Sequence, residues 1–443
     1  MSETKAHYFY FCESLNFNML VLAGLVFLYI FIPALINYLC FKSVFLRKIG
    51  AVVIAYGFGL LIGNIGLIPE SSHTMLELIA NKSIILTNKY VQELFAAGSI
   101  TGNDVSYFQV YHLQDLLTTL SIAIALPLLL FSLDVKKWFK VAGKTFLSMF
   151  LGLISVIIPI LIGFFLFKNQ IHDAWKVAGM MTGVYSGGTP NLASIQKALD
   201  VDTLTYILTH TYDLIIGVLF LFFVMTIGQK VLLRFLPAYK KSNIALSEVD
   251  FDNQQRESKS FFDSVKREYL LPNLAAIGLT LVIVGLSAGI GMLFNEKSQM
   301  MITILGITTF SILASLIKKV NRIEKTFDYG MYFILIFSVV VASMADFRLF
   351  SVSHIQIFYW VAMVYAGSLI IHVMLAALFK IDADNVIIIS TALTCSPPFV
   401  PVVAGALKNR EIIISGITVG IIGYAIGNYL GIMLAQILSY LYY

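Results

Sequence analysis

The stretch TGVYSGGTPNLAS, residues 182–194, lies in one of the most hydrophobic parts of the chain. Its paired glycines permit positive φ angles and the close approach of a ligand or another backbone. Thr189 can cap a helix that starts with Pro190 at its first position. Carbonyl groups at the end of an entering helix suit a cation, and N–H groups at the start of a returning helix suit an anion. The stretch therefore predicts a binding site for small charged species.

A second stretch, TCSPPFVPVVAGAL at residues 394–407, has the same order of a capping residue followed by proline. Aligned without gaps with SGGTPNLASIQKAL, it places Pro398 opposite Pro190. The alternative interpretation of either stretch is a kink that packs against a neighbouring helix. We expect substrate contacts from both tips, namely from Ser186, Gly187, Gly188, Thr189, Asn191, Thr394 and Ser396.

Two ionisable residues, His210 and Asp213, lie in the apolar stretch YILTHTYDLIIG. Their three-residue spacing places them on one face of a helix. Ionisable groups at membrane depth are costly and mark ion or substrate pathways. We expect Asp213 to bind Na⁺ or to carry a proton, with His210 tuning it. A polar pair that only joins helices is the alternative. Tyr185, through nearby carbonyl groups, and Asn428 complete the expected ion-coupling set.

The composition identifies the elements that must hold these residues. Hydrophobic residues make up 58% of the 443 residues, charged residues make up 12%, and the mean hydropathy is +0.86. These values exclude a soluble globular protein and predict an integral membrane protein of α-helices. The three scattered cysteines predict no metal site, haem site or disulfide framework. The net charge of +5 lies on alternate loops, so no nucleic-acid partner is expected.

Apolar runs long enough to span a membrane, about 20 residues, occur five times in each half of the chain. The predicted spans are 19–40, 49–68, 113–131, 144–167 and 203–227, then 271–294, 300–317, 330–345, 355–379 and 411–440. Residues 70–112 predict an interfacial helix or a folded loop. The predicted organisation is an N-terminal extramembrane segment at 1–18, a first repeat at 19–227, a polar cytoplasmic connector at 228–270 and a second repeat at 271–443.

Two further segments, 174–200 and 383–408, precede the last span of each half. Lys and Arg in short loops mark the cytoplasmic side of a membrane. If residues 174–200 crossed the membrane, the basic connector would lie outside. We therefore predict that each segment is a re-entrant hairpin, that the two halves are inverted repeats, and that the N-terminus is outside. This prediction rests on the basic residues of the loops and the connector, namely Lys42, Arg47, Lys48, Lys136, Lys137, Lys140, Lys144, Lys230, Arg234, Lys240, Lys241, Lys266, Arg267, Lys318, Lys319, Arg322 and Lys325.

The words MTGVYSGGTPNLASI and YILTHTYD resemble a YjcL-like bacterial membrane family of unknown function. The arrangement of spans is similar to that of the glutamate:sodium and citrate:sodium symporters. The resemblance covers nearly the whole chain. It implies a cation-coupled secondary carrier of a small organic anion or amino acid, with Gly187 and Gly188 as the glycine-rich tip. The second tip lacks the paired glycines of those symporters.

We therefore expect an all-α carrier in the bacterial cytoplasmic (inner) membrane, coupled to Na⁺ or H⁺ and without another cofactor. Its expected partners are the lipid bilayer and a small-molecule substrate, and a homodimer stays open. The alternatives are a cation/proton antiporter that uses Asp213, and a non-transporting scaffold or sensor. An enzyme is not expected, because the nucleophile-elbow pattern GLSAG at 285–289 lies in an apolar span with no strand before it.

Overall fold

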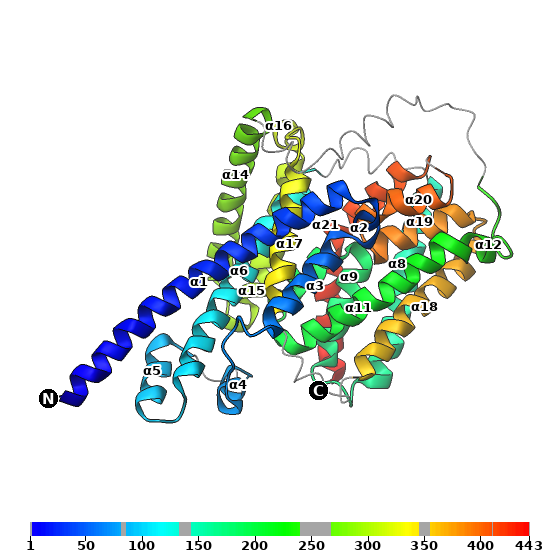
Figure 1. Ribbon diagram of the computed structural model, residues 1–443. Helices are drawn as coiled ribbons and strands as arrows, with labels where there is room; N and C mark the ends of the chain where they lie inside the picture. Colours follow the sequence, from blue (N-terminus) through cyan, green and yellow to red (C-terminus); the bar gives the residue numbers. More distant parts are fainter. Residues whose placement is uncertain are drawn as a thin grey trace.

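The computed structural model describes residues 2–80, 86–132, 143–239, 267–344, 355–409 and 411–442, and every regular element in these ranges is a helix (Figure 1). The first half contains α1 (Ser2–Lys42), α2 (Val44–Ile49), α3 (Ala51–Asn64), α4 (His73–Ala80), α5 (Asn88–Ala96), α6 (Gly102–Phe131), α8 (Gly143–Phe167), α9 (Ala174–Gly187), α10 (Thr189–Ala198), α11 (Thr203–Phe223), a π-helical turn η1 (Val224–Gly228) and α12 (Gln229–Leu232). The second half contains α14 (Arg267–Gly291), α15 (Glu296–Ser315), α16 (Lys318–Asn321), α17 (Thr326–Ser343), α18 (Ile355–Leu378), α19 (Ala383–Thr394), a 3₁₀ turn η5 (Pro397–Phe399), α20 (Val400–Ala406) and α21 (Ile413–Tyr442).

Nine helices of the described chain are long and apolar enough to cross a membrane, and they match nine of the ten predicted spans. The tenth, predicted at 49–68, corresponds to α3, which has 14 residues. At about 1.5 Å per residue, such a helix is shorter than the hydrocarbon core of about 30 Å. Gly50, with a φ of 97°, separates α2 from α3, and Gly66, with a φ of 80°, follows the end of α3. These two glycines account for the shortening.

Two boundaries differ from those predicted. The first helix starts at Ser2 and runs through the predicted N-terminal segment. Helix α6 starts at Gly102 rather than near residue 113, because Thr101 and Asp104 form a capping box there. The predicted interfacial region, 70–112, therefore contains α4, α5 and the first turns of α6.

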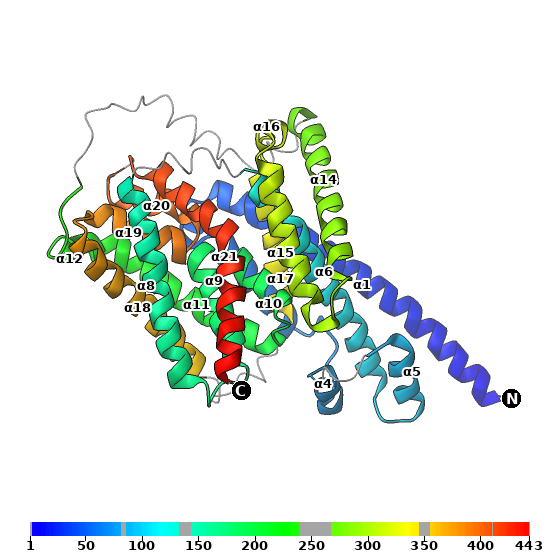
Figure 2. The same cartoon turned by 180° about the vertical axis from the view of Figure 1, so that it is seen from behind.

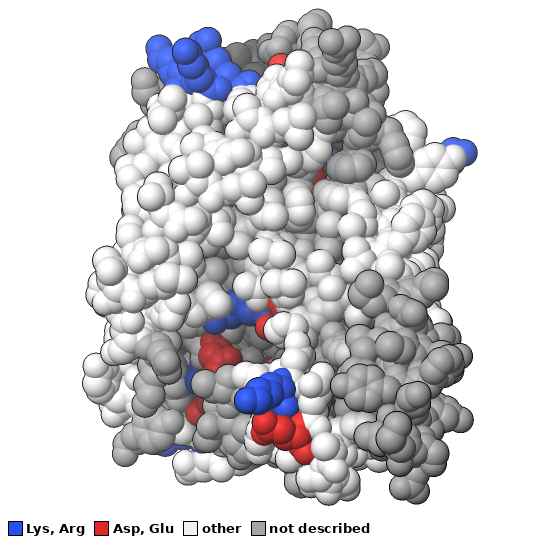
Figure 3. All heavy atoms as spheres, turned by 90° about the vertical axis from the view of Figure 1, so that its left-hand side faces the viewer, with Lys and Arg blue, Asp and Glu red and all other residues white. Residues whose placement is uncertain are grey.

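The long helices carry large apolar side chains on the outside of the molecule, for example Phe27, Phe150, Leu219, Leu281 and Met374. A water-soluble protein rarely exposes so much apolar surface, whereas lipid accommodates it. Figure 3 shows a broad belt with few charges between an upper end that carries Lys and Arg and a lower end of mixed charge. The chain is therefore a membrane protein of many apolar helices.

The end of the molecule that holds α2, α12, α16 and α20 (Figure 1) carries most of the predicted cytoplasmic charges that the structure describes. These include Lys42, Lys230, Arg234, Lys318, Lys319 and Arg322. Residues Lys136, Lys137, Lys140, Lys240, Lys241 and Lys266 lie outside the described residues, as do the side chains of Arg47, Lys48 and Arg267.

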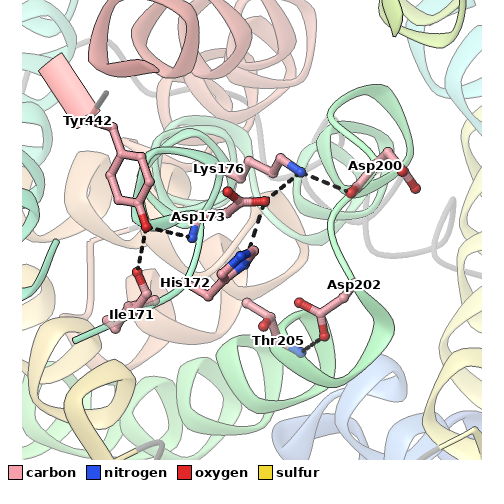
Figure 4. A network of polar contacts seen from close by, with 8 residues as sticks. All are labelled: Ile171, His172, Asp173, Lys176, Asp200, Asp202, Thr205 and Tyr442. Carbon is pink, nitrogen blue, oxygen red and sulfur yellow. Dashed lines mark hydrogen bonds and ion pairs between the residues drawn. The ribbon is translucent and has the colours of Figure 1, made fainter. Parts of the chain in front are cut away.

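Residues 174–200 form a helical hairpin. The chain turns at Gly188, which has a φ of 96°, and α10 then returns along α9. Ile195 of α10 packs on Gly183 of α9. The Lys176 Nζ donates to the carbonyl oxygen of Asp200 at 3.4 Å (Figure 4). The two ends of the segment are therefore adjacent.

Residues 383–409 form a second hairpin from α19, η5 and α20. The chain turns at Ser396, which has a φ of 82°. The Asn409 amide donates to the Asp384 carboxylate at 2.8 Å, so the two ends of this segment are also adjacent. Figures 1 and 2 show that its ends lie at the opposite end of the molecule from those of the first hairpin. Left-handed residues bracket both hairpins: Asp173 and Asp200, then Lys380 and Lys408.

Helices at matching positions in the two halves have reciprocal packing partners. Helix α3 packs on α17, and its counterpart α15 packs on α6. Helix α1 likewise packs on α17, and α14 packs on α6. Helices α6 and α17 pack on each other, as do α8 and α18. The two halves therefore form one interleaved bundle.

The first hairpin is held by the glycine-lined face of α21. Gly423 lies against the backbone of Ser186, and Gly427 lies against the side chain of Asn191. The Asn191 amide donates to the Gly423 carbonyl oxygen at 3.0 Å. Small residues let helices approach closely in membranes, and here they admit the non-helical tip of the first hairpin.

Replacing Gly427 with Ala should destabilise the protein by about 1–3 kcal/mol, because the added Cβ overlaps the Asn191 amide. The measurement is the midpoint of thermal unfolding of the purified protein in detergent. The matched control is Gly285→Ala in α14, where an added Cβ meets nothing within 4 Å. Equal midpoints for G427A and G285A would contradict the described contact between α21 and the first hairpin.

Candidate functional site

A cavity of about 880 Å³ extends from the two hairpin tips toward the end of the molecule that holds α2 and α20. Thr189 and Ser396 contribute from the tips, and Ile49 and Ala406 contribute near that end. The remaining wall comes from α1, α3, α11, η1, α17, α18 and α21. The volume is within the range of about 300–1,000 Å³ that small-molecule sites occupy.

The two hairpins meet tip to tip at the inner end of this cavity. A Cβ on Gly188 would overlap the Ser396 hydroxyl. Both residues have positive φ angles, 96° and 82°. Glycine adopts this conformation without strain, whereas serine does so at a cost. The backbone at the meeting point is therefore specialised on both sides.

Asp213 is the one Asp, Glu, Lys, Arg or His among the described residues that line the cavity. Its side chain is 5% exposed and accepts a hydrogen bond from the Tyr365 hydroxyl at 3.0 Å. The Tyr365 ring in turn packs edge-on against the Tyr185 ring, with centroids 5.1 Å apart. No ion pair to Asp213 occurs in the described part of the chain. Since a buried charge needs a partner, this carboxyl group calls for a proton or a bound cation.

His210 lies on the same helix as Asp213 but has different neighbours. Its Nδ1 lies 3.4 Å from the Tyr206 hydroxyl. Its ring packs edge-on against Tyr56, with centroids 4.6 Å apart. Within the described residues no hydrogen bond or ion pair joins His210 to Asp213. No direct contact therefore supports the expected tuning of Asp213 by His210.

Of the predicted substrate-binding residues, Thr189, Thr394 and Ser396 line the cavity. The other four are not part of its lining. The Ser186 hydroxyl donates to the Thr182 carbonyl oxygen at 2.7 Å, inside its own helix.

The remaining three tip residues have packing contacts. Asn191 and Gly187 face α21, whose Gly423 lies against both of them. Gly188 forms the contact between the tips. These residues therefore pack against α21 or the other tip and do not line the cavity.

Asn428 is not part of the cavity lining and instead forms hydrogen bonds to two other helices. It accepts a hydrogen bond from the Ser194 hydroxyl at 2.5 Å and donates one to the Thr308 hydroxyl at 3.1 Å. It thereby connects α10, α15 and α21, which matches the helix-joining role of polar residues in membrane bundles.

Sequence reasoning missed several cavity residues, among them Tyr365, Tyr424 and Phe399. Aromatic residues are frequent in apolar spans, so no pattern in the sequence distinguishes these from residues that face lipid. Tyr365 is identified as a site residue only by its hydrogen bond to Asp213, which joins two helices that are far apart in the sequence.

A second buried histidine, His372, was also missed. Its Nε2 lies 3.2 Å from the Ser148 hydroxyl and its Nδ1 lies 2.9 Å from the Ser390 hydroxyl. Both ring nitrogens therefore have partners, and the residue joins α8, α18 and α19.

The end of the first hairpin that faces away from the cavity is tied by a polar network (Figure 4). Lys176 forms an ion pair with Asp173 at 2.7 Å, in addition to its contact with Asp200. The Asp173 N–H donates to the hydroxyl of Tyr442, near the end of α21, at 3.2 Å. This network closes the hairpin base against α21.

No group of three or more His, Cys, Asp and Glu side chains able to hold a metal ion occurs in the described residues. The arrangement instead offers one carboxyl group, hydroxyl groups and aromatic rings around a largely apolar space. Such a lining can bind a small molecule and exchange a proton or a monovalent cation.

Comparisons with known proteins agree with the membrane character of the chain. The family model described as "Protein of unknown function (DUF819)" matches residues 104–441, well over half of the chain. The chain is also 22% identical over 346 residues to the uncharacterized membrane protein YjcL of Bacillus subtilis (strain 168), a match that covers 76% of this chain and 86% of that protein. The expected likeness to YjcL is thus confirmed, and the likeness to the glutamate and citrate symporters stays a prediction. The chain belongs to the DUF819 family, described as proteins of unknown function.

Proposed function

We propose that this protein is a cation-coupled secondary transporter that moves a small organic molecule across a membrane by alternating access. The observation that carries the proposal is the cavity that ends where two hairpin tips meet and that contains one buried carboxyl group, Asp213. Substrate and ion sites of secondary transporters are typically formed by interrupted helices at the interface of two repeats.

In this proposal the two halves are inverted repeats and each hairpin is re-entrant. The hairpins with ends on opposite sides, the left-handed residues that bracket both, and the reciprocal packing of α3 and α15 support it. Non-helical backbone at membrane depth is tolerated where it is buried in protein or lines a watery cavity. Gly188 and Ser396 satisfy that condition, since they contact each other next to the cavity.

The unequal surroundings of the hairpins suggest which state of a transport cycle this conformation represents. The first hairpin packs on α6, α15 and α21, and the network around Lys176 closes its base. The first hairpin reaches the cavity only near its tip, whereas the second hairpin lines it from its tip through α20, across from α2, α3 and α11. In a repeated fold, the other state would exchange these surroundings. The cavity extends toward the Lys- and Arg-rich end, so the charge rule makes this conformation inward-facing.

Asp213 is the proposed coupling residue, with Na⁺ or H⁺ as the coupling ion. A second mode, antiport, is favoured by one observation: the described lining contains a single carboxyl group and no basic side chain. A proton and a cationic solute would then neutralise the same group in turn. The organic anion or amino acid expected from the sequence resemblance stays a prediction.

Replacing Asp213 with Asn should abolish cation binding in the absence of any substrate. Purified protein in proteoliposomes on a solid-supported membrane should give a transient charge displacement after a jump in Na⁺ or H⁺ concentration. We expect D213N to reduce this displacement about tenfold or more, because it removes the one carboxyl group of the cavity.

The matched control for that experiment is Asp202→Asn. Asp202 caps α11 by accepting a hydrogen bond from the Thr205 N–H at 2.9 Å, and asparagine caps helices equally well. This variant should keep the wild-type displacement. Equal charge displacement in D213N and wild type would remove Asp213 from the coupling site.

Cys395 provides a test of the open side of the cavity. It lines the cavity beside Ser396 and is 9% exposed. With Cys12 and Cys40 replaced by Ser, a membrane-impermeant maleimide should label Cys395 several-fold faster in inside-out vesicles than in right-side-out vesicles. The reverse ratio would contradict the proposed inward-facing state.

A further inference from the structure

The charge balance of the cavity lining bears on the substrate. The described lining contains the Asp213 carboxyl group and no Lys, Arg or His side chain. A buried anion requires a basic group, a metal ion or a set of N–H donors to replace its hydration. The described lining contains no basic side chain, so hydroxyl groups such as those of Thr189, Ser396 and Tyr424, together with the backbone at the hairpin tips, would have to supply the donors without a countercharge.

The second tip is poor in such donors. Three of the five residues from 397 to 401 are prolines, which have no N–H. The other two N–H groups, of Phe399 and Val400, donate to the carbonyl oxygens of Ser396 and Pro397. The start of the returning helix therefore offers few of the free N–H groups that create an anion site at other helix N-termini.

The first tip has a similar shortage. Pro190 lacks an N–H. The N–H groups of Asn191 and Leu192 both donate to the Gly188 carbonyl oxygen, at 3.0 and 3.3 Å. The N–H groups of Thr189 and Ser396 are the backbone donors that remain at the two tips, so the hydrogen bonding there gives little support to the sequence-based expectation of an anionic group.

The same lining contains groups that suit a cation. Asp213 supplies the countercharge, and three aromatic rings, those of Tyr365, Tyr424 and Phe399, also line the cavity. Aromatic faces attract organic cations, most strongly where water is excluded. Thr394 lies at the C-terminal end of α19, where the helix dipole is negative.

We propose that the cavity binds a monovalent organic cation with an apolar body, such as a protonated amine or a quaternary ammonium ion. Its charge lies at Asp213, and its body lies against Tyr365, Tyr424 and Phe399. The inference rests on the proposed transport function and deepens it. Because the cavity offers one carboxyl group, the organic cation and the coupling ion occupy it in turn, which makes the transporter an exchanger.

The test uses three probes of similar shape and different charge: benzyltrimethylammonium, 3-phenylpropionamide and 3-phenylpropionate. A ligand that binds the folded state raises the unfolding midpoint, and the stabilisation grows with the logarithm of the ratio of ligand concentration to Kd. With the full-length protein in an uncharged detergent, we expect a concentration-dependent rise for the ammonium probe alone. D213N should weaken its apparent affinity about tenfold or more, and D202N should not.

A second measurement needs no change at Asp213 and therefore does not depend on the folding of D213N. Benzyltrimethylammonium should slow maleimide labelling of Cys395, which lines the same cavity, and 3-phenylpropionate should not. Concentration-dependent stabilisation or saturable protection by the phenylpropionate instead, or an ammonium effect that D213N leaves unchanged, would overturn the assignment of a cationic substrate.

The outcome also separates this inference from the transport proposal. If the protein shows ion-driven charge displacement and binds only the anionic probe, the transport proposal is supported and the cationic substrate is rejected. Binding of the ammonium probe at Asp213 without any charge displacement would keep the cation site and reject ion-coupled transport.

Discussion

The meeting of two interrupted helices within an apolar bundle is the constraint on which the rest of the structure depends. Lipid provides no partner for free backbone N–H and C=O groups, so an interruption must be covered by protein or face a watery space. Gly188 and Ser396 interrupt their hairpins at positive φ and contact each other. The glycine face of α21 covers the first tip from behind, and the cavity borders both tips. The position of the cavity thus follows from where the helices break.

The two hairpins have unequal surroundings. Close packing and the Lys176 network cover the first hairpin except near its tip, while the second hairpin lines the cavity from its tip through α20. Tight packing of small residues on backbone holds one arrangement until an alternative set of contacts can replace it. In the proposed transport cycle, the second hairpin acquires the contacts that the first now makes.

The buried polar residues of the bundle have different surroundings: some form hydrogen bonds between helices, whereas Asp213 lines the cavity. Asn191, Asn428 and His372 each contact residues of other helices, and their hydrogen bonds hold the hairpins in place. Asp213 is different, since it faces the cavity with one tyrosine hydroxyl as its hydrogen-bond donor. A buried carboxyl group with so little compensation is the feature that ties the cavity to a cation or a proton.

The sequence by itself determined the membrane class, nine of the spanning helices, the two segments that interrupt the pattern, and Asp213 as an ionisable group among apolar residues, because composition, hydropathy and proline or glycine placement are local properties. It could not determine which residues of the first tip face the cavity. Ser186 and Asn191 face α21 because the glycines of a helix more than 200 residues later in the chain lie against them. Tyr365 hydrogen-bonds to Asp213 because α18 packs on α11, and the His210 ring packs on Tyr56 of α3. The direction of a side chain within a helix bundle is set by the distant helix that packs beside it, and that partner is decided only by the tertiary structure.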